Sequence, residues 1–120
     1  MPINKSYEVI YTTKKEARKH AIDKIMELKK YKKFYIGATS NPEERLLEHI
    51  SDKKMNTMYI LCRTPTKHKT KILEKSLIKR FYKLKNNIND VKLDQNGNII
   101  QGGGGEGITE DTNYIYVLFR

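Results

Sequence analysis

Residues 34–51, FYIGATSNPEERLLEHIS, constrain the fold more than any other part of the chain, because a strand pattern passes directly into a helix pattern. Residues 34–36 have high strand propensity, and Gly37 allows another group to approach the backbone closely. Asn41 is a good N-cap, and Pro42 suits the first helical position, where its missing N–H costs nothing. The sequence therefore predicts a strand–helix unit with a sharp boundary.

The predicted helix has two faces. Leu46, Leu47 and Ile50 fall on one apolar arc, which we expect to pack on the core. Arg45 and His49 lie one turn apart on an adjacent basic edge, close to the end of the strand. Periodicity alone favours an ordinary strand–helix unit whose Arg–His edge is solvated.

Length and charge set the first bounds on function. A chain of 120 residues is the size of one compact domain, so we treat residues 1–120 as a single domain. The formal net charge of +10 favours a polyanion as partner. No strongly hydrophobic amphipathic segment accompanies this charge, so a membrane surface is a weaker candidate.

Cys62 is the one cysteine in the sequence, so no intrachain disulfide can form and a zinc site built from cysteine and histidine is excluded. We expect Cys62 to be a buried strand residue. The beginning of the sequence lacks an apolar signal region, and no stretch is long enough to span a membrane. The expectation is an intracellular protein, cytoplasmic or nuclear and not secreted.

The remaining pattern alternates strands and helices. A capping box at Thr13 opens a helix whose apolar stripe includes Met26, and a second helix is expected from Lys67 to Lys85. Asn96-Gly97 is typical of a type I′ hairpin turn. A glycine-rich loop at 102–105 is either a flexible linker or a place where a nucleic-acid backbone approaches. The expected strands are Tyr7–Thr12, Asn56–Arg63 and Asn113–Phe119.

Glu74 falls on the core-facing arc of the second long helix, between the directions of Ile78 and Phe81. A buried carboxylate is costly unless something compensates its charge. A salt bridge to an arginine such as Arg45 would do so, and so would a divalent cation. The helix pattern does not decide between the two.

Tyr35-Ile36-Gly37, followed by Arg45 and His49, resembles the second half of the signature of the GIY-YIG nucleases. Glu74 stands in a Leu-Glu-x-x-x-Ile context similar to that of the family's metal-binding glutamate, and Asn89 follows about where a family asparagine stands. The resemblance covers roughly residues 33–90. It implies an α/β fold with a small, mainly antiparallel central sheet flanked by helices.

The resemblance also implies a division of labour in cleaving DNA. One tyrosine would act as base or orient the water, Arg45 would steady the phosphate, and His49 would orient a tyrosine. Tyr35 is the tyrosine that matches the family by position. Glu74 would hold one Mg²⁺ or Mn²⁺. A tyrosine beside a metal and an arginine can have its phenol pKa lowered. Supporting roles fall to Gly37 and Asn89.

The family's GIY strand, which normally precedes the YIG strand in a hairpin, is missing from its place. The missing tyrosine is expected to be Tyr116, in Asn113–Phe119, with Tyr11 as the alternative. A strand–helix–strand connection normally makes parallel strands, so the N-terminal strand runs the wrong way for an antiparallel partner of residues 34–38. We therefore predict that Asn113–Phe119 pairs antiparallel with the YIG strand.

Two functions are consistent with the sequence. The first is a divalent-metal-dependent endonuclease of the GIY-YIG type acting on DNA. The second is a catalytically silent nucleic-acid-binding module on the same scaffold. Family members often carry a separate DNA-targeting domain, which these 120 residues lack. We therefore expect weak specificity, or specificity gained through a homodimer or a separate targeting partner.

Overall fold

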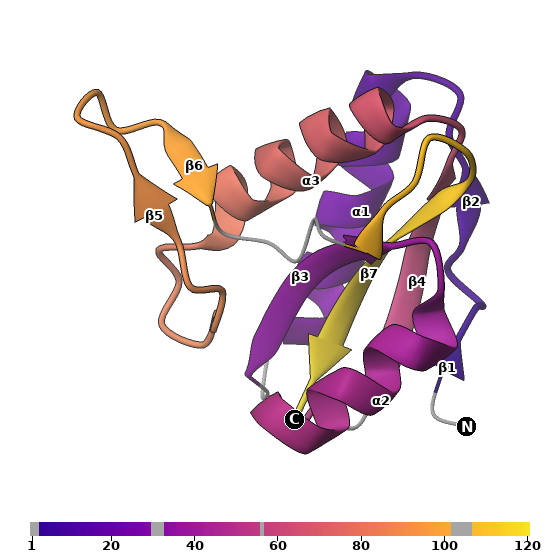
Figure 1. Ribbon diagram of the computed structural model, residues 1–120, viewed down its shortest axis with the longest axis horizontal. Coiled ribbons are helices and arrows are strands. Elements are labelled where there is room, and N and C mark those ends of the chain that lie inside the picture. The colour runs from indigo at the N-terminus through magenta and orange to yellow at the C-terminus, as the bar shows by residue number, and fades with distance from the viewer. Residues whose placement is uncertain (1–2, 30–32, 56, 102–106) are drawn as a thin grey trace.

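Five strands form one mixed sheet in the order β1–β4–β7–β3, with β2 also paired to β4 (Figure 1). The computed structural model describes residues 3–29, 33–55, 57–101 and 107–120, so the glycine-rich stretch 102–105 lies outside it. The sheet strands are β1 (Ile3–Asn4), β2 (Val9–Ile10), β3 (Phe34–Thr39), β4 (Thr57–Thr64) and β7 (Asn113–Phe119). The helices of the described residues are α1 (Lys14–Leu28), α2 (Pro42–Lys53) and α3 (Lys67–Phe81).

Strand β7 lies between β3 and β4 and runs antiparallel to both. This arrangement confirms the prediction that the C-terminal strand pairs with the YIG strand, and the register sets Gly37 opposite Tyr116. The sheet is mainly antiparallel as expected, through the long β3–β7 and β4–β7 pairings, while the short strands β1 and β2 both pair parallel with β4. The sheet is mixed because the N-terminal segment adds to β4 on the side away from β7.

Strands β2 and β3, which α1 connects, run parallel as the strand–helix–strand rule predicts, but they are not neighbours in the sheet. Strands β2, β4 and β3 point the same way, and β4 and β7 separate the first from the last. The N-terminal strand is shorter than expected, because β2 pairs only at Val9 and Ile10. The C-terminal strand is therefore the one available to lie beside β3.

Helices α1 and α3 pack together on one face of the sheet, and α2 covers the other face (Figure 1). Thr13 caps α1 as predicted, its side chain accepting a hydrogen bond from the Glu16 N–H. Ala17, Ala21 and Ile25 are buried against the sheet and α3. Met26 is 41% exposed, so its assignment to the buried stripe was wrong.

Helix α2 begins as predicted, with the Asn41 side chain accepting from the Glu44 N–H. Its buried face differs from the prediction, because Leu47 and Ile50 are 59% and 42% exposed. The helix instead lays Pro42, Leu46 and His49 on the sheet. The reason is tertiary: the sheet offers the Tyr116 hydroxyl to the His49 Nε2, so this ring nitrogen has a partner inside, and two apolar side chains remain outside.

The end of α3 and the hairpin that follows it also differ from the prediction. Helix α3 ends at Phe81, before the expected Lys85. The hairpin β5 (Lys92–Leu93) and β6 (Ile99–Gln101) forms, but within the described residues Gly97 is the one glycine with positive φ and Asn96 is not left-handed. A type I′ turn needs two left-handed residues, so that assignment was wrong.

Strand β4 buries Cys62 as expected, and burial raises the pKa of its thiol to about 12. A thiol protonated at neutral pH is a poor nucleophile. Within the described ranges, no helix combines the length and the apolar character needed to cross a bilayer.

Candidate active site

Two tyrosines from neighbouring strands form the centre of the site. Tyr35 of β3 and Tyr116 of β7 lie with ring centroids 6.5 Å apart on the α2 face of the sheet. Gly37 makes room for the second ring, since a Cβ there would lie 2.5 Å from the Tyr116 Cζ and would also overlap its hydroxyl. The glycine of the YIG motif is therefore required by the ring opposite it in the register.

His49 joins α2 to this tyrosine pair. Its Nε2 lies 3.1 Å from the Tyr116 hydroxyl, and its ring centroid lies 4.9 Å from that of Tyr35. The imidazole is 4% exposed. The expected placement of His49 beside a tyrosine is what the structure shows, and the contact fixes the direction of the Tyr116 hydroxyl.

Burial raises the pKa of Tyr116 well above the usual value for a phenol. The neighbouring Tyr35 raises it further, and the Arg45 guanidinium opposes the shift without reversing it. A tyrosine beside a metal and an arginine was expected to have a lowered phenol pKa. In the protein alone, the pKa of Tyr116 is raised instead. Tyr116 is a protonated hydroxyl at neutral pH in this state.

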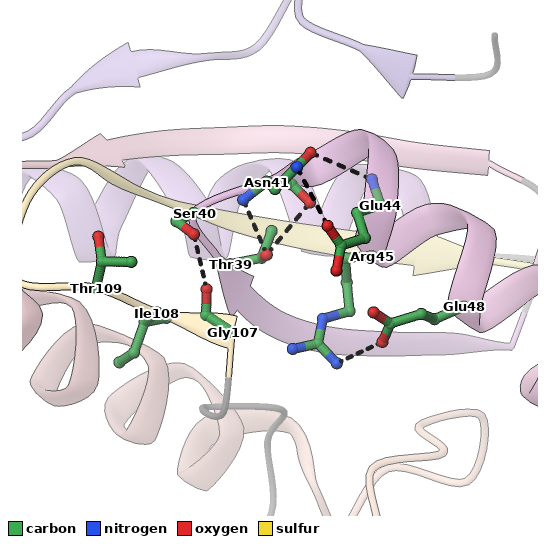
Figure 2. Close-up of a pocket in the computed structure, with 9 residues that line it drawn as sticks. All are labelled: Thr39, Ser40, Asn41, Glu44, Arg45, Glu48, Gly107, Ile108 and Thr109. Atoms are coloured by element: carbon green, nitrogen blue, oxygen red, sulfur yellow. Dashed lines mark hydrogen bonds and ion pairs between the residues drawn. The ribbon is translucent and has the colours of Figure 1, made fainter.

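Arg45 projects from the first turns of α2 into a cavity of about 310 Å³ (Figure 2). Its Nη1 lies 3.1 Å from the Glu48 carboxylate, and its side chain is 14% exposed. Gly107 lies against the guanidinium, where a Cβ would collide with Nη2, and its carbonyl accepts from the Ser40 N–H at 2.9 Å. The cavity is lined by Thr39, Ser40, Asn41, Glu44, Arg45, Glu48, Gly107, Ile108 and Thr109.

Glu74 is a buried carboxylate on α3, 6% exposed, as its helical position predicted. Burial raises its pKa to about 7, while the charges of Arg45 and Lys71 lower it in part. Glu74 is not among the residues that line the Arg45 cavity. Glu74 comes from α3 and Arg45 from α2, on opposite faces of the sheet, and the Arg45 charge acts on the pKa of Glu74.

Glu74 fits the role of a metal ligand on two counts. Its Oε2 is buried without a hydrogen-bond partner among the described residues, and the Arg45 charge does not offset its burial. Mg²⁺ prefers oxygen ligands and is often held by one or two carboxylates together with water and substrate phosphates. No group of three histidine, cysteine or carboxylate side chains that could hold a metal ion occurs within the described residues.

Asn89 supports the YIG strand from its open edge. Its Oδ1 accepts from the Ile36 N–H at 2.9 Å, and its Nδ2 donates to the Ile36 carbonyl at 2.8 Å. One side chain thus replaces a missing strand neighbour at the centre of β3. Its expected place as a supporting residue agrees with these contacts.

The sequence analysis missed Glu48 and Gly107. Glu48 stands three residues after Arg45 on the same helix, a spacing that brings two side chains together, so the pattern contained the signal. Gly107 follows the glycine-rich stretch, and nothing local in the sequence relates it to Arg45. Its part in the site depends on the chain returning to β3 from the far end.

A mixed sheet with a tyrosine pair on β3 and β7, joined by an arginine and a histidine from α2 and a buried carboxylate from α3, defines an α/β protein with an enzyme-like polar site. The family model for the GIY-YIG catalytic domain matches residues 25–89, more than half of the chain. The protein therefore belongs to the GIY-YIG family, whose members are in general divalent-metal-dependent nucleases that act on DNA. No curated protein and no solved structure matches the chain significantly.

Proposed function

We propose that this protein is a divalent-metal-dependent endonuclease that hydrolyses DNA phosphodiester bonds. The observation that carries the proposal is the cluster of Tyr35, His49 and Tyr116, with Tyr116 coming from the other end of the chain. The Arg45 charge acts on both Tyr116 and the buried Glu74. Family membership supports nuclease chemistry in general. The DNA substrate, the ion and the roles of individual residues belong to this proposal.

Arg45 is the proposed phosphate-binding group. Its guanidinium is always charged and offers a planar fork that matches two phosphate oxygens. In the free protein the Glu48 carboxylate is its partner at 3.1 Å. Glu48 is half exposed, so it can turn away into solvent when a phosphate takes its place.

The tyrosine pair and His49 are proposed to position the attacking water. Tyr35 keeps 6% of its surface exposed, whereas Tyr116 is fully buried behind it. Tyr35 is therefore the member that reaches the substrate side, and Tyr116 holds its proton at a hydroxyl that His49 orients. This assignment gives Tyr35 the direct role and Tyr116 the role of fixing the geometry around it.

Glu74 is the proposed ligand of the divalent cation, Mg²⁺ or Mn²⁺. A bound cation supplies positive charge for the phosphate and leaving-group oxygens. The Glu74 carboxylate has a buried, unpartnered Oε2 to offer, and Arg45 supplies a second positive group. The single cysteine suits a reducing compartment, and we place the activity inside the cell.

A plasmid-nicking assay with Mg²⁺ or Mn²⁺ against EDTA tests the proposal. We expect the wild type to nick with either ion and not with EDTA. Glu74→Ala should abolish nicking but bind DNA as well or more tightly, since a carboxylate is removed near phosphates. Glu27→Ala, which removes an exposed carboxylate on α1, is the matched control and should nick normally. Nicking by Glu74→Ala at the wild-type rate would show that Glu74 only compensates Arg45.

A catalytically silent nucleic-acid-binding module is the second candidate, and the full burial of Tyr116 favours it. The raised pKa of that hydroxyl leaves no phenolate available as a base in the free protein. This candidate predicts salt-sensitive DNA binding without metal-dependent nicking at any ion concentration. A homodimer or a targeting partner would supply specificity under either function.

A further inference from the structure

Helix α3 carries a lysine at every fourth position, at residues 67, 71, 75 and 79. Positions four apart lie on one inclined row, about 6 Å apart along the axis. Lys71, Lys75 and Lys79, which we call the lysine row, are all exposed and form no ion pair within the described part of the chain. Lys67, by contrast, lies 3.9 Å from Glu110.

The lysine row begins beside the candidate active site. Lys71 precedes Glu74 by three positions on α3 and Lys75 follows it directly, so the row passes next to the buried carboxylate. The Lys71 charge also acts on Glu74, whose pKa it lowers in part. A strand of DNA whose phosphate reached Arg45 and Glu74 would therefore meet the row as it left the site.

The other end of the lysine row opens into a groove of about 460 Å³ between α3, the start of α1 and the β5–β6 hairpin. Lys75 and Lys79 line it together with Lys14, Ser76 and Asn98, and no carboxylate is among its lining residues. Arg18 adds a further cation nearby, with its Nε 2.6 Å from the Ser76 hydroxyl. The groove combines positive charge with hydrogen-bond donors, which suits phosphate oxygens.

We propose that the lysine row and its groove bind the phosphate backbone of duplex DNA flanking the cleavage site. The inference rests on the proposed function and names the surface that holds the part of the substrate that is not cut. Phosphates follow one another at short, regular intervals along each DNA strand, so evenly spaced cations can neutralise successive phosphates. A straight, evenly spaced row of uncompensated cations matches such a backbone better than it matches an acidic peptide without a fixed spacing.

The test is binding of a fluorescent DNA duplex in EDTA, where no cleavage interferes. The triple variant Lys71→Gln/Lys75→Gln/Lys79→Gln should bind at least about tenfold more weakly at moderate salt, and its slope of log K against log salt should be shallower by about 2–3. The matched control, Lys5→Gln/Lys15→Gln/Lys33→Gln, removes the same charge from exposed positions on other segments. It should change the slope by less than about one.

Equal losses in the two triple variants would overturn the proposal, since they would show that overall charge alone attracts DNA. An unchanged slope of log K against log salt in the row variant would overturn it as well. So would a loss of affinity that appears only with single-stranded DNA or with RNA. Thermal melting checks that both variants fold. Lys75→Glu alone is a second, milder probe, and it should weaken duplex binding more than Lys15→Glu.

This experiment is independent of nicking. If the wild type fails to nick with Mg²⁺ or Mn²⁺, the endonuclease proposal fails while the row can still be tested by binding. If the wild type nicks and the row variant binds like the control, the surface assignment fails alone. Where both hold, the row variant should need a higher DNA concentration for half-maximal nicking.

Discussion

Burial sets the protonation of the two central groups of the site, Tyr116 and Glu74. Each is enclosed by packed side chains, and for each the removal of water outweighs the nearby Arg45 charge. Ionising the buried Glu74 costs free energy, and a bound cation would offset that cost. The first predictions therefore concern single side chains.

Glu74→Gln should stabilise the metal-free protein at pH 8. The folded pKa of about 7 lies above the ordinary value of 4.5, so ionisation is less favourable in the folded state. The contribution of Glu74 to the free energy of unfolding is therefore highest below pH 4.5, falls as the pH rises towards 7, and is constant above it. Glutamine removes a penalty on the order of 3 kcal/mol at pH 8 and has little effect at pH 4.

Chemical denaturation in EDTA at pH 4 and pH 8 measures this difference. An equal effect of Glu74→Gln at both pH values would contradict it. Adding Mg²⁺ or Mn²⁺ should raise the melting temperature of the wild type but not that of the glutamine variant, because binding to the native state alone stabilises it.

Arg45→Ala should lower the nicking rate by roughly 10²-fold or more, the scale of losing one charge-stabilising donor. Arg45→Lys should recover little, because a point charge does not replace a bidentate fork. His49→Ala should cost less than Arg45→Ala, since the histidine orients Tyr116 at 3.1 Å and does not contact the phosphate in this proposal. Single-turnover nicking rates rank the variants, and full activity of Arg45→Lys would exclude bidentate binding.

Gly37→Ala should destabilise the protein by about 1–3 kcal/mol, the usual cost of overpacking. Its new Cβ would lie 2.5 Å from the Tyr116 Cζ. In the Tyr116→Leu background, where the ring is gone, the same change should cost clearly less. Urea denaturation of the four proteins gives the coupling, and strict additivity would show that the ring is not the cause.

At the scale of elements, β7 determines which tyrosine completes the site. Tyr11 lies at the other end of the sheet order, with its N–H bonded to the Arg63 carbonyl and its ring 5.5 Å from the Lys69 Nζ. Tyr116→Phe should therefore reduce nicking, while Tyr11→Phe should leave it near wild type. The opposite result, an inactive Tyr11→Phe with normal cleavage by Tyr116→Phe, would assign the role to the N-terminal segment.

The edge of β3 depends on Asn89. Replacing it by alanine removes two hydrogen bonds to Ile36 and leaves backbone groups of the YIG strand without that partner. We expect a loss of about 1–3 kcal/mol in stability and faster hydrogen exchange at the Ile36 amide. Unchanged exchange there would mean that water replaces Asn89 without cost.

At the scale of the whole molecule, the net charge of +10 predicts steep salt dependence of DNA binding. Each neutralised phosphate contributes about −0.9 to the slope of log K against log salt, and we expect a total of about −4 or steeper. Titrations of a duplex between low and physiological salt measure the slope. A flat response would mean that the charge serves solubility alone.

The local sequence determined those parts of the protein that depend on neighbours in the chain. The Asn41 cap, the Thr13 cap and the inward direction of Glu74 all follow from the rules of helix geometry. The parallel-connection rule, which depends only on the order of strands and helices, argued against the N-terminal strand and so supported Asn113–Phe119 as the neighbour of β3. Physical chemistry acting over a few residues explains each of these.

Only the tertiary structure decided which face of α2 is buried and which groups complete the site. Leu47 and Ile50 have the apolar character of core residues, yet the Tyr116 hydroxyl turns His49 inward and leaves both exposed. Gly107 reaches Arg45 across the fold, and burial fixes the raised pKa values of Tyr116 and Glu74. Such features depend on contacts between distant segments and on the exclusion of water, and neither is encoded in the spacing of residues along the chain.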